Sequence, residues 1–547
     1  MTDFSLYAGR WIALTETAAV AGVGMTREEA RCAARATRPK ERLRLAWVAP
    51  HPPYIPLPEW PLVHLKTILP AEGIWLAGGP VRDLLLGCDL YDWDFAVAEN
   101  GREMARKVAN VIKAAYYPLD EERDTGRVIV TDPHTHRQTT LDFATLRGAT
   151  LEEDLRRRDF TINAMALTFD GILIDPTTGQ ADLSAGIIRM TGPSSFKDDP
   201  VRLLRAVRQA NALHFRFDTH TAAAMRTQAS SIITATPERI RTELLRMLHA
   251  VPAAHNLQTL SNFNLLNPIL PEIQALQTVL QTYPHNYANA HLHTLATIAA
   301  IEGILALIKG EARPPTTENY VPVPPWTWPM LADALLPFQS PLLSYLETPV
   351  NVDMLRADLL KWGALFHDVG KSATRTVDEE GHCHFYGHAE VGAQATAERL
   401  EALRFPGKAN AFIVTLVAEH MRLANINAAL TRRAAYRFYR DTGDAGVGVV
   451  LLALADAMAV WGHGLPQNHW RALLCHANVL LTSYFERSTE VIAPPPLLNG
   501  YDLMALGVPQ GPQLGRLLET LHEAQAAGEI TTREAAEDFV SRTLTGG

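Results

Sequence analysis

The chain has 547 residues, too many for one compact domain, and this length predicts roughly three or four domains. Hydrophobic residues make up 47% and charged residues 20%, a balance that excludes extended disorder. A net charge of −9 excludes a generic nucleic-acid coat, so any RNA binding must depend on local basic faces. Four scattered cysteines without a CxxC pair, no signal sequence and no uninterrupted long apolar run predict a cytoplasmic protein without disulfides or a membrane span.

Residues 1–48 predict a small N-terminal ββαβ module. Two alternating segments resemble a hairpin, a helix follows, and residues 43–49 return as a strand. Thr26 and Glu29 have the spacing of a capping box at the start of that helix. Nothing in the module indicates catalysis. Six prolines between Pro50 and Pro61 then predict a stiff, extended linker and a domain boundary.

A glycine turn follows the next predicted strand, residues 74–77. Gly78 and Gly79 allow a tight turn whose backbone N–H groups can cradle phosphate oxygens. A short helix over residues 81–86 would turn its positive end, and Arg82, toward the same phosphates.

Two aspartates lie just beyond this turn. Asp92 and Asp94 are two apart in a predicted strand, so both carboxylates share one face and can hold Mg²⁺ for two-metal phosphoryl transfer. Alone, such a turn or pair would more often be an ordinary turn and a solvated strand end. Together, GGPVRDLLLGCDLYDWD resembles the GGxVRDxLLG and DxD signature of polymerase-beta-like nucleotidyltransferases, specifically class II CCA-adding enzymes and bacterial poly(A) polymerases.

The resemblance implies an α/β nucleotidyltransferase head over residues 63–190. Within it we expect a helix over 101–115 and strands over 127–131 and 139–144. Asp142 stands where the family carries a third carboxylate on a neighbouring strand, which could bind metal or deprotonate the RNA 3′-hydroxyl.

The segment RRDFTINA resembles the family's second signature, the element that contacts the sugar and triphosphate. Arg157 and Arg158 supply cations for phosphate, and Asp159 and Asn163 supply a carboxylate and an amide for ribose hydroxyls. A charged helix end that pairs the preceding acidic residues with Arg156 would explain the charges but not the match.

Residues 191–255 resemble the family's helical neck, with helices over 198–212 and 237–249. We expect Asp199 and Arg202 to share a helical face, with Arg205 one turn on. A carboxylate that accepts from the base amine and a guanidinium that donates to the ring nitrogen would admit C and A and reject U and G.

A surface salt bridge is the commoner fate of such a pair. The family pattern begins Glu-Asp where this chain has Asp198 and Asp199, and the Asp/Arg pair itself is intact.

Residues 285–465 resemble the HD-type metal-dependent phosphohydrolases, in which histidines and aspartates from several helices hold one or two metals. The expected ligands are His293, His367, Asp368, His388, His420 and Asp456. Imidazole and carboxylate donors suit Mn²⁺, Fe²⁺, Ni²⁺ or Zn²⁺. His291, His382 and His384 fit the pattern less well and are expected to be solvated or to lie behind the ligands. Residues 312–329 form a Pro-rich insertion, expected to be a surface loop.

Residues 490–547 predict a C-terminal helical segment that holds RNA, although residues 514–526 could equally dimerise. The sequence thus predicts a multidomain α+β protein: the N-terminal module, a polymerase-beta-like α/β head, and a mostly α-helical neck, HD domain and C-terminus. The resemblance implies template-independent addition of CCA to tRNA 3′ ends from CTP and ATP, with Mg²⁺ in the head and a transition metal in the HD domain. The alternatives are a poly(A) polymerase or A-adding enzyme, an HD phosphohydrolase with a nucleotide-binding head, and an inactive RNA-binding protein.

Overall fold

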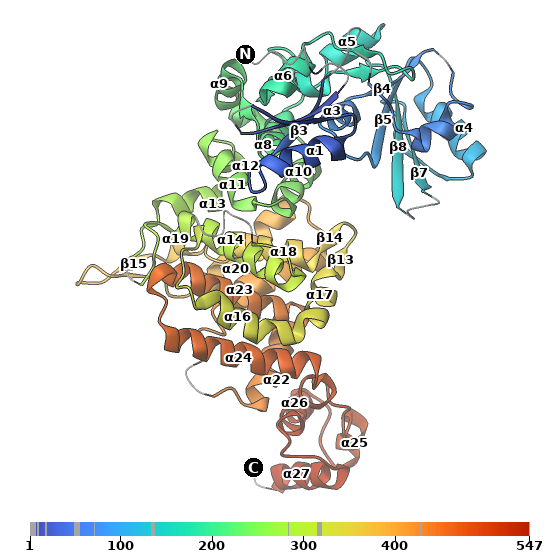
Figure 1. Cartoon of the computed structure of the whole chain (residues 1–547). Helices are drawn as coiled ribbons and strands as arrows, with labels where there is room; N and C mark the ends of the chain where they lie inside the picture. The colour runs from blue at the N-terminus through green and yellow to red at the C-terminus, as the bar shows by residue number, and fades with distance from the viewer. Residues whose placement is uncertain are drawn as a thin grey trace. The chain divides into compact units, whose positions relative to one another are not determined.

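The computed structural model describes residue 7 and residues 10–16, 19–48, 55–70, 72–132, 137–282, 284–313, 320–426 and 429–545. The chain divides into two compact units, Met1–Ser231 and Ile232–Gly547, and each is described by itself (Figure 1). Parts of several predicted segments lie outside the described residues. They include residues 1–6, 8–9 and 17–18 of the N-terminal module, residues 50–54 of the linker, residues 314–319 of the Pro-rich insertion and residues 546–547 of the C-terminal segment.

The N-terminal module has the predicted ββαβ order. Its elements are β1 (Arg10–Leu14), β2 (Val20–Gly24), α1 (Arg27–Thr37) and β3 (Arg44–Val48), and the sheet order is β2-β1-β3. Thr26 caps α1 by accepting from the Glu29 N–H at 3.2 Å, while the Glu29 carboxylate accepts from the Met25 N–H at 2.8 Å. The module is anchored to the rest of its unit by Arg44, which donates to the carbonyl of Leu183.

A seven-stranded mixed sheet forms the head, in the order β10-β9-β4-β5-β8-β7-β6. The strands are β4 (Ile74–Ala77), β5 (Asp92–Val97), β6 (Ala115–Asp120), β7 (Thr125–Thr131), β8 (Gln138–Thr145), β9 (Ala166–Leu167) and β10 (Leu173–Ile174). The accompanying helices are α2 (Glu59–Leu65), α3 (Gly79–Leu85), α4 (Gly101–Ile112), α5 (Leu151–Arg156) and α6 (Gly179–Ala185). The prediction that α4 continues to residue 115 was wrong, because Lys113 adopts a left-handed φ of 54° and Ala115 opens β6.

One face of the central strands is aromatic and buried. Trp93 and Phe95 on β5 and Phe143 on β8 are each no more than 1% exposed, and the rings of Phe95 and Phe143 stack at 4.9 Å. Because side chains alternate along a strand, this core leaves the intervening positions of β5 and β8 on the opposite face. The carboxylates described below occupy those positions.

The first unit ends with α7 (Ser195–Asp198), α8 (Arg202–Leu213) and α9 (Thr219–Gln228), and β11 (Ile187–Ile188) pairs with β12 (Arg216–Phe217). The predicted helix over residues 198–212 is interrupted. Asp199 is extended, with φ −152° and ψ 96°, because the proline at position 200 disfavours helical geometry in the residue before it. Asp199 and Arg202 therefore do not share a helical face, and Arg202 is the first residue of α8.

The second unit is mainly helical. It begins with α10 (Pro237–His249), α11 (Ala253–Asn262), α12 (Leu266–Ile269) and α13 (Pro271–Ala275). Its larger helices are α14 (Ala290–Lys309), α16 (Thr327–Leu335), α17 (Gln339–Glu347), α18 (Arg356–Phe366), α20 (His388–Ala402), α21 (Gly407–Glu419), α22 (Arg432–Thr442), α23 (Gly446–Trp461) and α24 (Gln467–Phe485). Two short hairpins, β13 (Pro349–Asn351) with β14 (Met354–Leu355) and β15 (Thr376–Val377) with β16 (Cys383–His384), and the short α19 (Lys371–Thr374) complete it.

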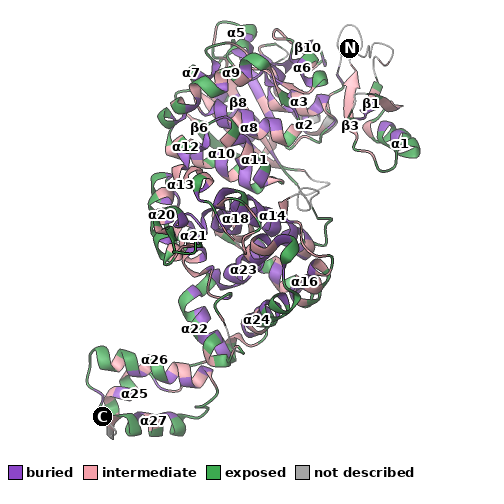
Figure 2. Cartoon of the chain, turned by 90° about the vertical axis from the view of Figure 1, so that its left-hand side faces the viewer, coloured by how far each residue is buried: buried purple, intermediate pink, exposed green. Residues whose placement is uncertain are grey.

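The core of this unit is built on α14, α18 and α23, which are mostly buried (Figure 2). Two helical segments are long and apolar enough to cross a membrane by composition, Ala290–Lys309 and Arg432–Gly464, but 89% and 83% of their apolar windows are buried inside the protein. Burial of this extent is typical of core helices in a globular fold.

A buried ion pair joins this core to α10 and α11. Lys361 on α18 lies 3.1 Å from the carboxylate of Glu302 on α14, and it also donates to the Leu248 carbonyl at 2.8 Å. The same Glu302 carboxylate accepts from the Ala253 N–H at 2.9 Å. The pair therefore satisfies backbone groups at the end of α10 and the start of α11.

The C-terminus forms three helices, α25 (Gly500–Ala505), α26 (Pro512–Ala526) and α27 (Arg533–Thr545). They share a small apolar core of their own, which includes Leu503, Leu521 and Val540. Ion pairs connect α26 and the turn after it to α22, among them Arg440 with Glu519 at 2.6 Å.

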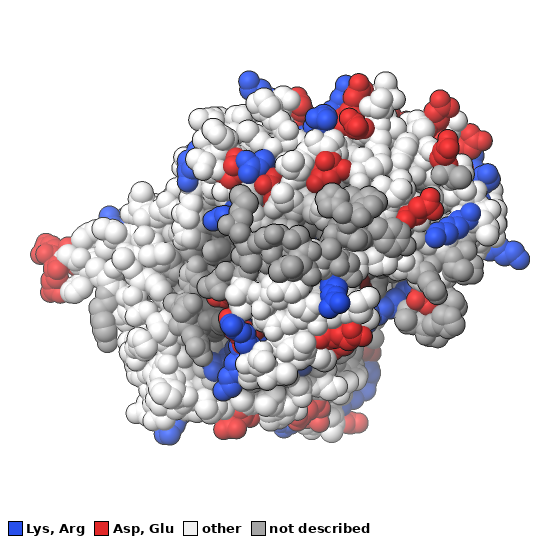
Figure 3. Space-filling model, turned by 45° about the horizontal axis from the view of Figure 1, so that its top comes forward, with Lys and Arg blue, Asp and Glu red and all other residues white. Residues whose placement is uncertain are grey.

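Surface charge is mixed in sign. Among the described residues drawn in Figure 3, Lys and Arg lie interspersed with Asp and Glu, without one large basic field on that face. This distribution agrees with the net charge of −9 and leaves phosphate binding to local groups of cations.

Candidate functional site

Three carboxylates lie side by side on the face of the head sheet opposite Trp93 and Phe95. Asp92 and Asp94 alternate on β5 with the buried Trp93. β5 and β8 pair in parallel with Asp94 directly opposite Asp142. The structure thus brings together the three aspartates selected from the sequence, which we call the carboxylate row.

The surroundings of Asp94 shift its pKa. Its burial and the charge of Asp142 raise the pKa of Asp94 to about 6, against the opposing effect of Arg158. Carboxylates that resist ionisation beside one another gain stability from a cation among them. Their hard oxygen donors suit Mg²⁺, which prefers one or two carboxylates and retains waters.

Sequence reasoning missed Arg127 on β7, which contacts the row. Arg127 is the register partner of Asp142 and donates Nε to Oδ1 at 2.8 Å and Nη2 to Oδ2 at 2.7 Å. Arg127 could have been predicted beside Asp142 only from the antiparallel pairing of β7 with β8, and only if the register of that pairing were known.

The glycine turn lies beside the second signature. Gly78 has φ 84°, and a Cβ there would lie 2.4 Å from Nη1 of Arg158. The turn therefore needs glycine both for its left-handed backbone and for the close approach of this guanidinium. Arg158 itself is oriented by Asp154, 3.1 Å away.

A hydrogen-bonded network connects the selected polar residues of the head and α8. Arg82 donates to Asn163 at 2.7 Å, Asn163 donates to Asp159 at 2.9 Å, and Asp159 pairs with Arg205 at 3.1 Å. Burial opposes ionisation of Asp159, but Arg205 and the hydrogen bond from Asn163 outweigh it and lower the pKa of that carboxyl. The network keeps these groups in fixed positions beside the glycine turn.

Arg202 is engaged with the backbone of the second signature. Its buried guanidinium donates to the Arg157 carbonyl at 2.8 Å and to the Ser195 hydroxyl at 3.0 Å, and it lies 4.0 Å from the Asp199 carboxylate. Burial lowers the pKa of Arg202. Asp199 and Arg202 are therefore close in space, although a base could take a hydrogen bond from Arg202 only beside these contacts or in place of them.

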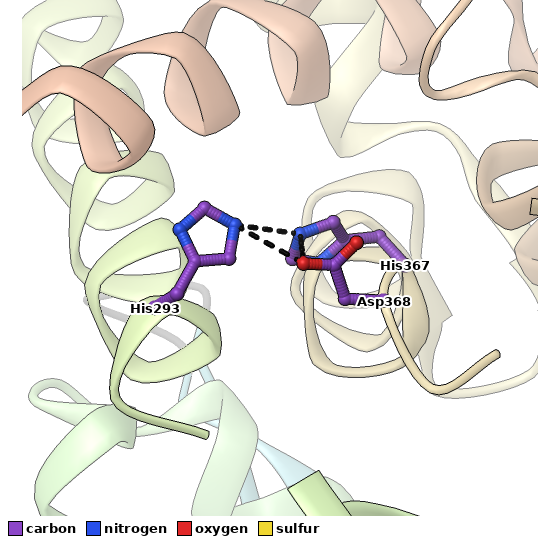
Figure 4. A group of neighbouring side chains, drawn as sticks. All are labelled: His293, His367 and Asp368. Atoms are coloured by element: carbon purple, nitrogen blue, oxygen red, sulfur yellow. Dashed lines mark hydrogen bonds and ion pairs between the residues drawn. The ribbon is translucent and has the colours of Figure 1, made fainter. Parts of the chain in front are cut away.

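The six predicted HD ligands converge on one point in the second unit. They come from α14 (His293), the end of α18 (His367 and Asp368), the start of α20 (His388), the end of α21 (His420) and α23 (Asp456). Figure 4 shows His293 pointing across from its helix toward His367 and Asp368. Nε2 of His293 lies 2.9 Å from Asp456, 3.1 Å from Nε2 of His367 and 3.4 Å from Asp368.

Asp368 belongs to two groups of possible ligands. One group is His293, His367 and Asp368; the other is Asp368, His388 and His420, and in each the ligand atoms lie within 4.8 Å of one another. Nδ1 of His367 lies 2.7 Å from the Ala364 carbonyl, and His388 and His420 make equivalent contacts with backbone carbonyls. Because these contacts fix the ring orientation, each Nε2 is left to face the centre, which suits a metal ligand.

The buried ionisable groups of the HD centre shift one another's pKa values. Burial opposes protonation of His367, but Asp368 and Asp456 outweigh it and raise the pKa of that imidazole to about 10. Burial and the neighbouring His367 lower the pKa of His420 to about 4. Imidazole and carboxylate donors in this arrangement fit a divalent transition metal, whose charge would replace the proton on His367.

Other histidines around the centre behave differently from one another. His285, which sequence reasoning missed, stacks edge-on against His293 with ring centroids 5.7 Å apart. His291 is 2% exposed and is therefore not solvated. His382 and His384 lie on the exposed β15–β16 hairpin and pair with Asp378, outside the two ligand groups.

Comparison with known proteins places these features in families. The Poly A polymerase head domain matches residues 74–189, the probable RNA and SrmB-binding site of polymerase A matches 214–276, and the HD domain matches 346–461. The A-adding tRNA nucleotidyltransferase of Deinococcus radiodurans is 33% identical over 89% of this chain and 97% of its own length. This chain belongs to the class II tRNA nucleotidyltransferase and poly(A) polymerase family.

Further relatives support the same assignment. The CC-adding tRNA nucleotidyltransferase of Thermus thermophilus is 32% identical over 85% of this chain and 92% of its own length. A solved structure of a CCA-adding enzyme with ATP has a TM-score of 0.52 at 20% identity and covers 86% of this chain and 91% of that chain. The last similarity shows a shared fold and confirms the predicted fold class.

Proposed function

We propose that this chain is a tRNA nucleotidyltransferase that adds the CCA end to tRNA from CTP and ATP and releases pyrophosphate. The observation that carries the proposal is the carboxylate row, Asp92 and Asp94 with Asp142 opposite, beside the glycine turn within the part that matches the polymerase head. We propose a soluble, cytoplasmic protein and the domain limits expected from the sequence.

In the proposed mechanism, Mg²⁺ bound at Asp92 and Asp94 would supply the charge that activates the attacking and leaving oxygens. Gly78 and Gly79 let the backbone approach the triphosphate, and Arg82 and Arg158 lie beside this turn to neutralise it.

The remaining residues, from the head and the neck, would hold and select the nucleotide. Asn163 and Asp159 would contact the sugar, and Asp199 and Arg202, which lie 4.0 Å apart, would select the base. Arg205 holds Asp159 in place at 3.1 Å. Their side chains, rather than a nucleic-acid strand, would act as the template.

The test is incorporation into tRNA that lacks its 3′ CCA. The protein is incubated with this tRNA and Mg²⁺, with CTP and ATP given singly and together, and the products are sequenced. We expect CC with CTP alone and one further A with both nucleotides. Asp92→Ala should abolish incorporation while the fold and tRNA binding persist. Incorporation that survives this substitution would contradict the assigned site.

A second candidate function is addition of one kind of nucleotide only. It is favoured by the relatives that align over most of this chain, which are A-adding and CC-adding enzymes, whereas the multifunctional CCA proteins cover 42–63% of it. The same assay separates the candidates. Addition of A only to tRNA ending in CC would identify an A-adding enzyme, addition of CC alone would identify a CC-adding enzyme, and a long A tail would identify a poly(A) polymerase.

We propose in addition that the HD centre binds a divalent transition metal and hydrolyses phosphoesters at RNA 3′ ends. The convergence of six residues supports this proposal: five form two groups that share Asp368, and the sixth, Asp456, lies 2.9 Å from His293. Metal analysis of the purified protein, followed by a chelator-sensitive assay on 2′,3′-cyclic phosphate, tests binding and turnover separately. Asp368→Ala, which removes the carboxylate common to both groups, should abolish both without affecting nucleotide addition.

A further inference from the structure

Both carboxylate oxygens of Asp142 accept hydrogen bonds from one guanidinium. Arg127 contacts both of its oxygens in a parallel fork, at 2.8 Å and 2.7 Å. Such bidentate pairs are the strongest and most directional of side-chain hydrogen bonds. The side chains of Arg127 and Asp142 are 39% and 19% exposed, so part of the fork is shielded from water.

The fork continues the carboxylate row across three strands. Arg127 on β7 is opposite Asp142 on β8, and Asp142 is opposite Asp94 on β5. Asp92 and Asp94 have no comparable fork among the described residues. The three carboxylates are therefore not equivalent: two can receive a divalent cation, and the third already has a cation on both oxygens.

A metal ion bound to Asp94 and Asp142 together would have to share these oxygens with a positive charge or displace it. Either arrangement costs free energy, because a guanidinium and a divalent ion repel one another at short range. An ion can instead bind Asp92 and Asp94, whose two carboxylates lie next to one another on one strand.

We propose that Arg127 is a positioning residue that holds Asp142 away from the metal, so that Asp92 and Asp94 alone bind Mg²⁺. Asp142 then fixes Arg127 at the edge of the site, and both lie close enough to orient the RNA 3′-hydroxyl without binding the ion. This inference rests on the proposed nucleotidyl transfer and removes Asp142 from its metal ligands.

The test measures Mn²⁺ binding to the full chain by the loss of the free-ion EPR signal. Ions that still bind to the Asp92→Ala variant are assigned to the HD centre and subtracted. The compared variants are Arg127→Met, which removes charge and fork, and Arg127→Lys, which keeps the charge but cannot form the fork. Arg102→Met is the matched control, because Arg102 pairs with Asp124 on another part of the head.

If the fork holds Asp142 back, Arg127→Met tightens Mn²⁺ binding on the order of tenfold. Arg127→Lys tightens it as well, and Arg102→Met leaves it unchanged. In the Asp142→Asn background, Arg127→Met has a much smaller effect, because no third carboxylate is freed. Unchanged or weaker Mn²⁺ binding in Arg127→Met overturns the inference. Parental affinity in Arg127→Lys also overturns it, because the positive charge of residue 127 alone, without the fork, would then explain the affinity.

Nucleotide addition by the same variants distinguishes this inference from the proposed function. If the parent adds no nucleotides, the proposed function fails whatever the Mn²⁺ affinities are. If the parent is active and needs the same Mg²⁺ concentration as Arg127→Met for half-maximal rate, only the role of Arg127 fails.

Discussion

Lys361→Met should strongly destabilise the second unit. The side chains of Lys361 and Glu302 are 4% and 0% exposed, and their charged groups lie 3.1 Å apart. Removing the ammonium leaves a buried carboxylate without its counter-ion and the Leu248 carbonyl without its donor. Breaking a buried pair by removing one partner costs about 3–5 kcal/mol. For a unit that spans Ile232–Gly547, with an unfolding entropy of about 2.1 cal/mol/K per residue, that loss lowers the melting temperature by roughly 5 to 8 °C.

The loss should also depend on pH. Burial raises the pKa of Glu302, and Lys361 opposes this rise. Without the lysine the pKa rises further, so the folded variant favours the protonated carboxyl. The variant is then least stable at neutral pH and recovers as pH falls toward the pKa of an unfolded glutamate, about 4.3.

Differential scanning calorimetry at pH 7 and pH 5 measures both effects. Lys408→Met serves as the control, because Lys408 is exposed on α21 and its replacement should change stability by less than about 0.5 kcal/mol. Lys361→Met combined with Glu302→Leu should regain much of the lost stability, since no buried charge remains. A melting temperature within 2 °C of the parent for Lys361→Met alone, by calorimetric measurement, would refute the reasoning.

Three further predictions concern the sites. Because the pKa of Asp94 is raised to about 6, protons should compete with Mg²⁺ below that pH, and the Mg²⁺ concentration for half-maximal nucleotide addition should rise as pH falls from 7 to 5. Gly78→Ala should reduce nucleotide addition by about 100-fold or more, measured as kcat/KM, because the new Cβ meets Arg158 and the backbone is left-handed; Gly464→Ala, with open space around it, should leave the rate unchanged. Asp368→Ala should remove all metal from the HD centre in elemental analysis, whereas His388→Ala should leave the group containing His293 able to bind.

Local chemistry made much of the head predictable. The alternation of Asp92, Trp93 and Asp94 places two carboxylates on one face whatever the rest of the sheet does, and the structure shows that alternation. The helix from Pro237 to His249 was predicted with its observed limits, because Pro237 begins it and Pro252 lies three residues beyond its end.

What could not be predicted depends on contacts between distant segments. Arg127 pairs with Asp142 only because β7 and β8 adopt one register, and a shift of one residue would turn the arginine to the other face. Arg202 was expected on a helical face with Asp199, but the proline between them makes Asp199 extended, and the arginine donates to the backbone of another segment. The contact of His285 with His293 could not be predicted either, because His285 lies in a loop and a loop has no periodic sequence pattern.

The HD centre also bears on how the second unit holds together. Its ligands come from five helices, α14, α18, α20, α21 and α23, or from the residues directly after them, and the other contacts of these helices include the apolar core and the buried pair of Lys361 with Glu302. An ion bound there would act as a removable cross-link between all five, and mass action would add about 2.7 kcal/mol to the stability of the native state at a free-ion concentration 100 times Kd. The metal concentration in the cell would then change the stability of the second unit and so the amount of folded protein. This would hold even though the head does not use that ion.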